Sequence, residues 1–339
     1  MTLPTRDALR LEWTRQALAD PDATLERASN DASFRSYWRS HSAGRSWIVM
    51  DAPPDREDIR PWLDVASRLA RAGVHVPEIQ AADPDRGFVV MEDLGDRLFL
   101  PELNESTADR LYGAALDALL AMQLRADGSD LPVYDEARLV TEMELMPEWL
   151  LKRHLGYTPE CEEWDVIESA FRALVNNARL QPQVFVHRDY HSRNLMLLEP
   201  SAGLGANPGI IDFQDAVYGP ISYDLVSLFK DAYIRWDEDF ILDLLIRYWE
   251  TAKKLGLPVR AEFADFHRDF EWMGVQRHIK VLGIFARLSH RDGKDGYLAD
   301  MPLVMDYLRR ACKRYRDLGP LLKLLDRLEP EETQVGYTF

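Results

Sequence analysis

The spacing of apolar residues divides the chain into two stretches with different periods. In the first, Leu9, Trp13 and Ala17 recur at helical spacing, which predicts an amphipathic helix over residues 5–20. Short β-rich segments separated by polar turns follow, a pattern typical of antiparallel strands. They lie at residues 23–29, 34–40, 46–51, 76–83 and 87–95, with a helical pattern between the third and the fourth. The pattern over residues 1–94 therefore predicts a small antiparallel sheet with a helix across it.

The second stretch, from Glu105 onward, is mostly helical in its spacing. Residues 138–155 predict one helix, and a long helix is expected from Glu262 to Leu288. Short apolar runs interrupt this pattern at residues 183–187, 194–199 and 209–213, and residues 200–209 resemble a flexible hairpin tip. We therefore expect an α+β chain with two lobes, a sheet-containing lobe at residues 1–94 and a larger, mostly helical lobe at residues 95–339.

Composition narrows the class of protein. The chain has 339 residues, of which 46% are hydrophobic, so it can bury a substantial core and is neither disordered nor fibrous. A net charge of −16 argues against a nucleic-acid or anionic-membrane partner, because both need clustered Lys and Arg. No run of 18 apolar residues occurs, and the first residues lack the pattern of a leader peptide, so we expect none. Cys161 and Cys312 have no metal-binding or redox spacing. We expect a soluble, cytoplasmic monomer with free thiols and a small polar substrate.

One group of polar residues has the types and spacing of a catalytic site. The stretch VHRDYHSRN places Asp189 five positions before Asn194, between two predicted strands, and a third predicted strand ends at Asp212. This layout is expected to bring the three side chains together. Two carboxylates about 4 Å apart repel by roughly 4 kcal/mol at an effective dielectric near 20, so such a cluster would either shift its pKa values or need a cation. The oxygens of Asn194 and Asp212 suit Mg²⁺, which takes its other ligands from water and nucleotide phosphates. Asp189 is then free to accept a proton from a substrate hydroxyl.

These motifs resemble the aminoglycoside phosphotransferase and choline kinase superfamily, which shares a bilobal fold with protein kinases. The resemblance rests on VHRDYHSRNLMLLE, GIIDFQDAVYGPISYDLVSLF and GFVVMEDLG, in an order that spans roughly residues 25–235. It implies an ATP-dependent phosphotransferase in which Asp189 is the catalytic base and Asn194 and Asp212 bind Mg²⁺. Residues 91–95, with Glu92 and Leu94, correspond to the hinge whose backbone receives adenine. His187 and Asp224 correspond to structural supports of the catalytic loop.

The phosphate-binding elements depart from the family pattern. Where a glycine-rich turn is expected, the chain has SNDAS, so backbone amides and the side chains of Asn30 and Ser33 are candidate phosphate ligands. Met50 stands where the third strand normally carries a lysine, and no lysine precedes Lys152. We expect either an arginine on the second strand, Arg35 or Arg39, to hold the phosphates instead, or magnesium and backbone amides to hold them alone.

The sequence indicates the acceptor substrate less clearly than it indicates the type of reaction. Residues 30–39, 47–54, 91–99 and 275–298 together resemble the bacterial anomeric kinases of N-acetylmuramate and N-acetylglucosamine, which serve cell-wall sugar recycling. That resemblance implies phosphorylation of the C1 hydroxyl. Two alternatives stay open: a kinase of an aminoglycoside, choline or another alcohol, and an inactive nucleotide-binding pseudokinase. Glu144, Arg277 and His278 are candidate acceptor ligands, although Arg277, His278 and Lys280 equally fit an exposed helix face.

Overall fold

The structure is a computed structural model that describes residues 5–29, 35–199 and 207–328. The chain forms two compact units, one made of Met1–Asp127 with Arg193–Asp215 and the other of Gly128–Ser192 with Ala216–Phe339. The chain therefore passes from one unit to the other three times. The predicted lobe boundary at residues 94 and 95 falls inside the first unit, which also includes α3 (Phe99–Glu102) and α4 (Ala108–Arg125).

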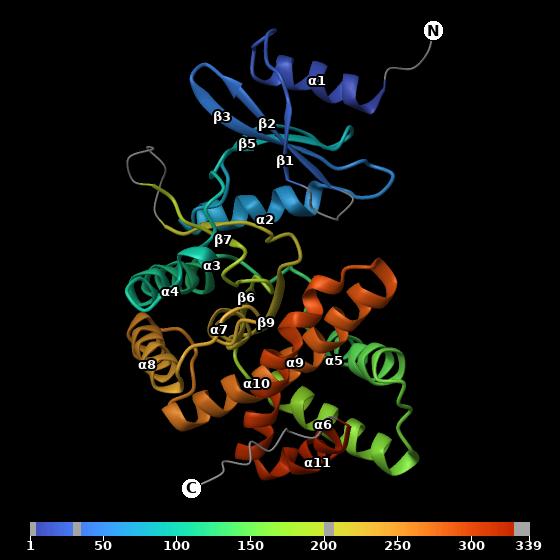
Figure 1. Ribbon diagram of the computed structural model, residues 1–339. Helices are drawn as coiled ribbons and strands as arrows, with labels where there is room; N and C mark the ends of the chain where they lie inside the picture. The colour runs from blue at the N-terminus through green and yellow to red at the C-terminus, as the bar shows by residue number, and fades with distance from the viewer. Residues whose placement is uncertain (1–4, 30–34, 200–206, 329–339) are drawn as a thin grey trace, which may run out of the picture. The chain divides into compact units, whose positions relative to one another are not determined.

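The first unit contains the predicted antiparallel sheet (Figure 1). Its strand order is β1-β2-β3-β5-β4, so the first three strands form a meander and β5 pairs with β3. The strands are β1 (Glu26–Ser29), β2 (Ser36–Ser42), β3 (Arg45–Asp51), β4 (Ile79–Asp83) and β5 (Phe88–Glu92). Each overlaps a segment expected from the sequence, and the predicted α+β fold class is confirmed.

Two helices cover opposite faces of this sheet (Figure 1). On one face lies α1 (Arg6–Ala17), whose Trp13 packs with Val49 and Phe88 in a buried cluster. On the other lies α2 (Arg60–Arg71), which begins with a proline at its first turn, a position where the missing N–H costs nothing. Because side chains alternate across a strand, Val49 of β3 faces α1 while its neighbours Ile48 and Met50 face the other way.

A short two-stranded ribbon completes the first unit. It pairs β7 (Leu195–Met196) with β8 (Gly209–Ile210) in antiparallel register. The predicted hairpin is confirmed in these strands, while its tip at residues 200–206 lies outside the described residues. Leu94, Met196 and Leu198 pack together beneath the ribbon, so the segment after β5 and the ribbon share one small core.

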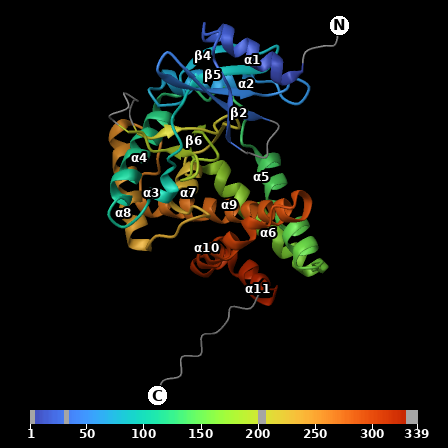
Figure 2. The same cartoon turned by 45° about the horizontal axis from the view of Figure 1, so that its top comes forward.

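The second unit is organised around α9 (Phe263–Asp292), a helix of 30 residues that ends at Gly293 in the left-handed conformation. Figure 2 shows α10 and α6 beside it. The other elements are α5 (Glu136–Met143), η1 (Met146–His154), α6 (Cys161–Leu180), β6 (Gln183–Val186), β9 (Val217–Pro220), α7 (Tyr223–Phe229), α8 (Glu238–Leu255), η3 (Asp295–Asp300), α10 (Met301–Arg314), η4 (Arg316–Leu318) and α11 (Gly319–Leu328). Helices α5, α6, α7, α10 and η1 all contact α9.

The single helix expected over residues 138–155 is wrong. The segment divides into α5 and the π-helix η1, and Pro147 lies in the first turn of η1. Proline lacks the N–H that continues an α-helical ladder, which explains the break. The backbone of η1 also approaches α9 closely, because a Cβ added at Gly283 would lie 2.4 Å from the carbonyl carbon of Leu145. Only glycine fits there without displacing η1.

Cys161 and Cys312 are free thiols, as the sequence predicts. Within the described residues, none of the helices combines the length and the apolar composition needed to cross a membrane.

Candidate active site

The loop that follows β6 carries Asp189 and is held by a buried carboxylate. Asp224, in the first turn of α7, accepts the backbone N–H groups of His187 at 2.7 Å and Arg188 at 3.0 Å. Arg188 has a φ of 78°, which is strained for a residue with a side chain. The imidazole of His187 is fully buried, and its Nδ1 accepts the Asp189 N–H at 3.3 Å. Asp224 and His187 thus have the contacts of loop supports.

Asp189 is half-buried and ionised. Burial alone raises the pKa of its carboxyl, but the positive charges of Arg277 and Lys280 lower that pKa to about 2. Arg277 lies on α9, with its guanidinium 3.7 Å from an Asp189 oxygen. The same guanidinium donates to the Arg188 carbonyl and to the Tyr223 hydroxyl, both at 2.9 Å. These bonds fix a positive charge beside the proposed base.

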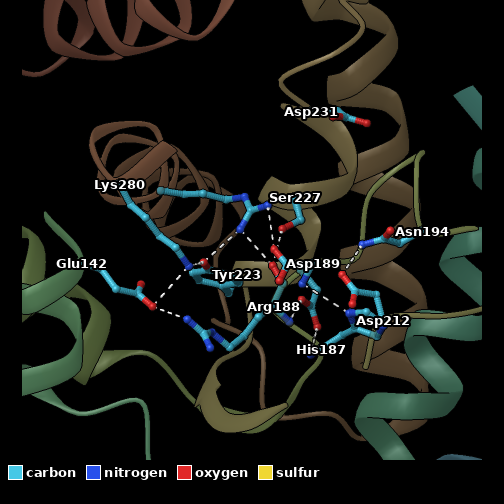
Figure 3. Close-up of polar contacts among 12 residues, drawn as sticks. Glu142, His187, Arg188, Asp189, Asn194, Asp212, Tyr223, Ser227, Asp231 and Lys280 are labelled. Carbon is cyan, nitrogen blue, oxygen red and sulfur yellow. Dashed lines mark hydrogen bonds and ion pairs between the residues drawn. The ribbon is translucent and has the colours of Figure 1, made fainter. Parts of the chain in front are cut away.

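A second carboxylate, Glu142 at the end of α5, lies at the centre of a buried charge network (Figure 3). It pairs with Arg188 and with the Lys280 ammonium, the latter at 3.2 Å, and it accepts the Tyr134 hydroxyl. Burial opposes its ionisation, yet Lys280 and Arg188 together hold the pKa of Glu142 below its usual value. Since Arg188 directly precedes Asp189, this network holds the loop that carries Asp189 to α5.

Asp224 predicts a specific pH dependence of stability. Complete burial raises the pKa of its carboxyl to about 7, although the N–H groups of His187 and Arg188 oppose the shift. Between about pH 4 and pH 7 the folded chain keeps this proton and the unfolded chain loses it, so the free energy of unfolding should fall as pH rises, by about 4 kcal/mol at most. In Asp224→Asn this component should vanish, as measured by denaturant unfolding at each pH. Equal pH slopes in the two proteins would contradict the assignment. Asp189 does not interfere, because its depressed pKa affects stability only below about pH 4.

The ribbon of the first unit brings Asn194 and Asp212 together. The Asn194 amide donates to the Asp212 carboxylate at 3.2 Å, and Gln214 donates to the other carboxylate oxygen at 2.8 Å. Asp212 has a φ of 65° and is exposed, which turns its side chain out of the strand direction. Turning the Asn194 amide would present its oxygen instead of its nitrogen. One carboxylate and one amide oxygen then fit Mg²⁺, which takes few protein ligands. Among the described residues, no cluster of three His, Cys, Asp or Glu side chains could hold a metal.

A pocket in the first unit adjoins this pair. Ile48, Met91 and Met196 supply apolar surface, Leu94 supplies the segment after β5, and Asn194 and Asp212 also line the pocket. Within the described residues, no hydrogen-bond partner is found for the backbone N–H of Leu94, although Leu94 is only 5% exposed. A buried N–H without a partner is costly unless a ligand accepts from it. The side chain of Glu92 is occupied, since it contacts His75 at 3.0 Å and accepts the Glu78 N–H at 3.2 Å.

The predicted phosphate ligands are only partly described. Asn30 and Ser33 lie outside the described residues. Arg35 is 9% exposed and forms a two-point pair with Glu57, which precedes α2. Arg39 lines the pocket but is bound to Asp93 by two hydrogen bonds of 2.6 and 3.2 Å. Met50, on β3, is fully buried.

A separate cavity, in the second unit, is lined by Asp189, Arg277 and the side chains that follow α7. Tyr233, Phe285 and Tyr297 supply aromatic surface, with neighbouring rings 5.3 to 6.3 Å apart. The exposed-face interpretation of Arg277, His278 and Lys280 is wrong, because they are 7%, 2% and 6% exposed. His278 also lines the cavity, but its Nε2 meets the Lys230 carbonyl and its ring stacks on Tyr307. Glu144 is exposed and does not line the cavity.

Together, an antiparallel sheet unit, a helical unit and an HRDxxxxN loop followed by IDF define a kinase-like phosphotransferase. The chain belongs to the phosphotransferase enzyme family (APH), whose model matches residues 24–263.

Relatives of known function match nearly the whole chain. The N-acetylmuramate/N-acetylglucosamine kinase of Pseudomonas aeruginosa is 49% identical over 308 residues, which cover 91% of this chain and 89% of the relative. The protein of the same name from Neisseria meningitidis is 44% identical and covers 96% of this chain and 97% of its own length. The corresponding kinase of Caulobacter vibrioides is 34% identical, with coverage of 92% and 94%. The resemblance expected from the sequence is confirmed.

Solved structures support the fold. Choline kinase LicA from Streptococcus pneumoniae aligns with a TM-score of 0.62 at 12% identity, over 93% of this chain and 99% of that one. The ADP-bound aminoglycoside phosphotransferase APH(2'')-Ib aligns with a TM-score of 0.58 at 16% identity, over 89% and 97%. At such low identity these likenesses establish the kinase-like fold alone.

Proposed function

We propose that this chain transfers the γ-phosphoryl group of ATP to the anomeric C1 hydroxyl of N-acetylmuramate, N-acetylglucosamine or both, as a step in the recycling of cell-wall sugars. The names of the relatives that match over 91 to 96% of the chain support this choice. The observation that carries it is the position of Asp189, an ionised carboxylate that lines the cavity of the helical unit.

The first unit binds the nucleotide in this proposal. Adenine enters the pocket of Ile48, Met91 and Met196, and its ring nitrogen accepts the N–H of Leu94. The backbone of Glu92 is the second hinge contact, because the side chain of Glu92 already contacts His75. Asn194 and Asp212 hold Mg²⁺ through oxygen atoms. A bound Mg²⁺ would offset the negative charge that develops on the phosphates during transfer.

Arg35 replaces the missing lysine as the cation for the phosphates. Its pairing with Glu57 holds the guanidinium just before the start of β2, and Arg35 directly follows residues 30–34 in the chain. A guanidinium offers five N–H donors, so a carboxylate and a phosphate can share it. The charge is permanent, since the pair with Glu57 outweighs burial and keeps the pKa of Arg35 above its usual value.

Arg35→Ala should therefore raise the KM for ATP by about tenfold, the effect of losing one charge-assisted hydrogen bond of about 1.4 kcal/mol, with little change in the KM for the sugar. Initial rates at varied ATP measure the effect. Arg15→Ala, which removes a partly buried guanidinium on α1 that donates to the Ala23 carbonyl, is the matched control and should leave both constants unchanged. An unchanged KM for ATP in Arg35→Ala would assign phosphate binding to other groups.

The second unit supplies the acceptor chemistry. The C1 hydroxyl donates to an Asp189 oxygen, a new bond forms between O1 and the γ-phosphorus, and the bond from that phosphorus to the bridging oxygen of ADP breaks. The proton of the hydroxyl passes to Asp189. A carboxyl with a pKa of about 2 is a weak base, which suits a late proton transfer in a loose, metaphosphate-like transition state. The anomeric hydroxyl helps, because it is more acidic than an ordinary alcohol.

The lining of the cavity selects among acceptors. An aminoglycoside is a polycation and needs several available carboxylates, whereas the carboxylates among the described lining residues are Asp189 and Asp231. Both are engaged by neighbouring groups. Lys230 and Arg277 line the same cavity and would repel the quaternary ammonium of choline. An uncharged or anionic amino sugar fits this balance, and Arg277 is the candidate partner for the lactyl carboxylate of N-acetylmuramate.

Acceptor competition tests the function. The purified chain with ATP and Mg²⁺ is offered N-acetylmuramate, N-acetylglucosamine, an aminoglycoside and choline in turn, and ADP release is measured with phosphorus NMR of the product. Sugar 1-phosphates formed only with the amino sugars, and abolished by EDTA, support the proposal. A product phosphorylated at another hydroxyl, turnover with choline or an aminoglycoside alone, or no turnover with any acceptor would each overturn it.

A further inference from the structure

Asp231, just beyond α7, is a buried carboxylate whose two oxygens bind two different elements. It is 2% exposed. One oxygen accepts both the backbone N–H of Ser192 at 3.0 Å and the Ser192 hydroxyl at 2.5 Å. The other accepts the N–H of Tyr233 at 3.2 Å. The neighbouring Lys230 ammonium pairs with Glu271 instead, and among the described residues hydrogen bonds rather than an ion pair hold this carboxylate.

The first of these elements is the catalytic loop. Ser192 lies three residues after Asp189 and is itself 1% exposed. The start of the loop is held by Asp224, so the two ends of the segment from His187 to Ser192 are tied to carboxylates at the two ends of α7. Because both carboxylates bind backbone N–H groups, they determine the path of the loop rather than the position of one side chain.

The second element is the wall of the acceptor cavity. The Tyr233 ring lies 5.6 Å from His191 and 6.3 Å from Phe285, measured between ring centroids. Tyr233 and Asp231 line the cavity together with Asp189. One carboxylate therefore connects the loop that carries the base with the surface that faces the acceptor.

We propose that Asp231 is a positioning residue that fixes the catalytic loop relative to the cavity lining around Tyr233. A sugar bound against Tyr233 then has its hydroxyl directed at Asp189. A buried carboxylate without a cation is costly, and three donors offset that cost only while the loop keeps this path. The inference rests on the proposed function for the identity of the acceptor, but the contacts that carry it are independent of which alcohol binds.

The experiment compares Asp231→Asn, Ser192→Ala and the double variant. The amide of Asp231→Asn keeps one acceptor oxygen but sets an NH₂ group against the donors of Ser192 or Tyr233. It should lower kcat about tenfold to a hundredfold while the KM for ATP changes less than twofold. More ADP should form per sugar phosphate, because water then competes with a misaligned hydroxyl. Ser192→Ala should give a smaller loss, and the double variant should lose less than the product of the single effects.

A buried carboxylate elsewhere in the same unit provides the control. Asp269 is 2% exposed, and its carboxylate accepts hydrogen bonds from Arg260 and Asn177. Asp269→Asn should leave unchanged both kcat and the amount of ADP formed per sugar phosphate. An unchanged kcat in folded Asp231→Asn, equal losses in Asp269→Asn, or fully multiplicative effects would each overturn the inference.

Hydrogen exchange separates this inference from the proposed function. In the wild type, N-acetylglucosamine should slow amide exchange across residues 187–193, and in Asp231→Asn these amides should exchange faster and lose the response to the sugar. A wild type that phosphorylates none of the acceptors overturns the proposed function. Exchange in residues 187–193 that is unaltered by Asp231→Asn overturns the positioning role, whether or not turnover is found.

Discussion

Asp189→Asn should reduce turnover by about 10² to 10⁴-fold, the contribution of one well-placed base, while nucleotide affinity changes less than twofold. Asparagine has the same size as aspartate, so the loop held by Asp224 and Arg277 keeps its shape. The amide cannot take the proton of the hydroxyl, and it leaves the charge of Arg277 without its carboxylate 3.7 Å away. Initial rates with N-acetylglucosamine and calorimetric titration with a nonhydrolysable ATP analogue measure the two quantities.

The nucleotide titration is the internal control, because the groups proposed to hold ATP belong to the other unit. If Asp189→Asn weakened nucleotide binding but left turnover at saturating ATP unchanged, Asp189 would be assigned to nucleotide binding and not to catalysis. Turnover within threefold of the wild type, with binding intact, would remove its role as a base.

Glu142→Ala should lower the free energy of unfolding by about 3 to 5 kcal/mol, the usual cost of removing one partner from a buried charge pair. Arg188 and Lys280 would both keep their charges inside the second unit, where their side chains are 17% and 8% exposed. The hydroxyl of Tyr134 would lose its acceptor as well. Guanidinium unfolding followed by circular dichroism measures the loss, and Glu142→Gln, which keeps the volume and one acceptor, should lose less than Glu142→Ala.

Glu144 provides the matched control, since it lies two residues along the chain and is exposed. Glu144→Ala should change the free energy of unfolding by less than about 0.5 kcal/mol, as is usual for surface positions. Similar losses at residues 142 and 144 would show that the charge network contributes no more than ordinary surface ion pairs.

The sequence predicts the local elements well because their signals are local. Alternating and helical apolar patterns give the strands of the sheet, α1 and α9, and the order of the motifs identifies the kinase-like fold. The ion-pair network depends instead on partners that lie far apart in the chain, since Glu142 pairs with Arg188 and Lys280. The sequence alone gives no reason to prefer Glu142 to Glu144, and the structure shows that Glu142 is the carboxylate that reaches the loop of Asp189.

The sequence pattern does not predict the positioning role proposed for Asp231, for a different reason. Its partners Ser192 and Tyr233 lie on either side of it in the chain, and the bond to Ser192 spans 39 positions. A polar residue after a short helix is ordinarily a solvated cap, and only the packing of the loop against α7 makes it buried. The sequence likewise leaves the choice between Arg35 and Arg39 open, because their carboxylate partners, Glu57 and Asp93, lie 22 and 54 positions away in the chain.

The three passages of the chain between its units affect how it can fold during synthesis. The ribbon that carries Asn194 and Asp212 belongs to the first unit but is encoded after residues 128–192, which belong to the second. A ribosome must therefore translate past residue 215 before the first unit receives its ribbon, which is a two-stranded sheet separate from the five-stranded one. A fragment ending at Asp127 would leave Leu94 without the apolar partners Met196 and Leu198, and no single cleavage of the chain could release either unit whole.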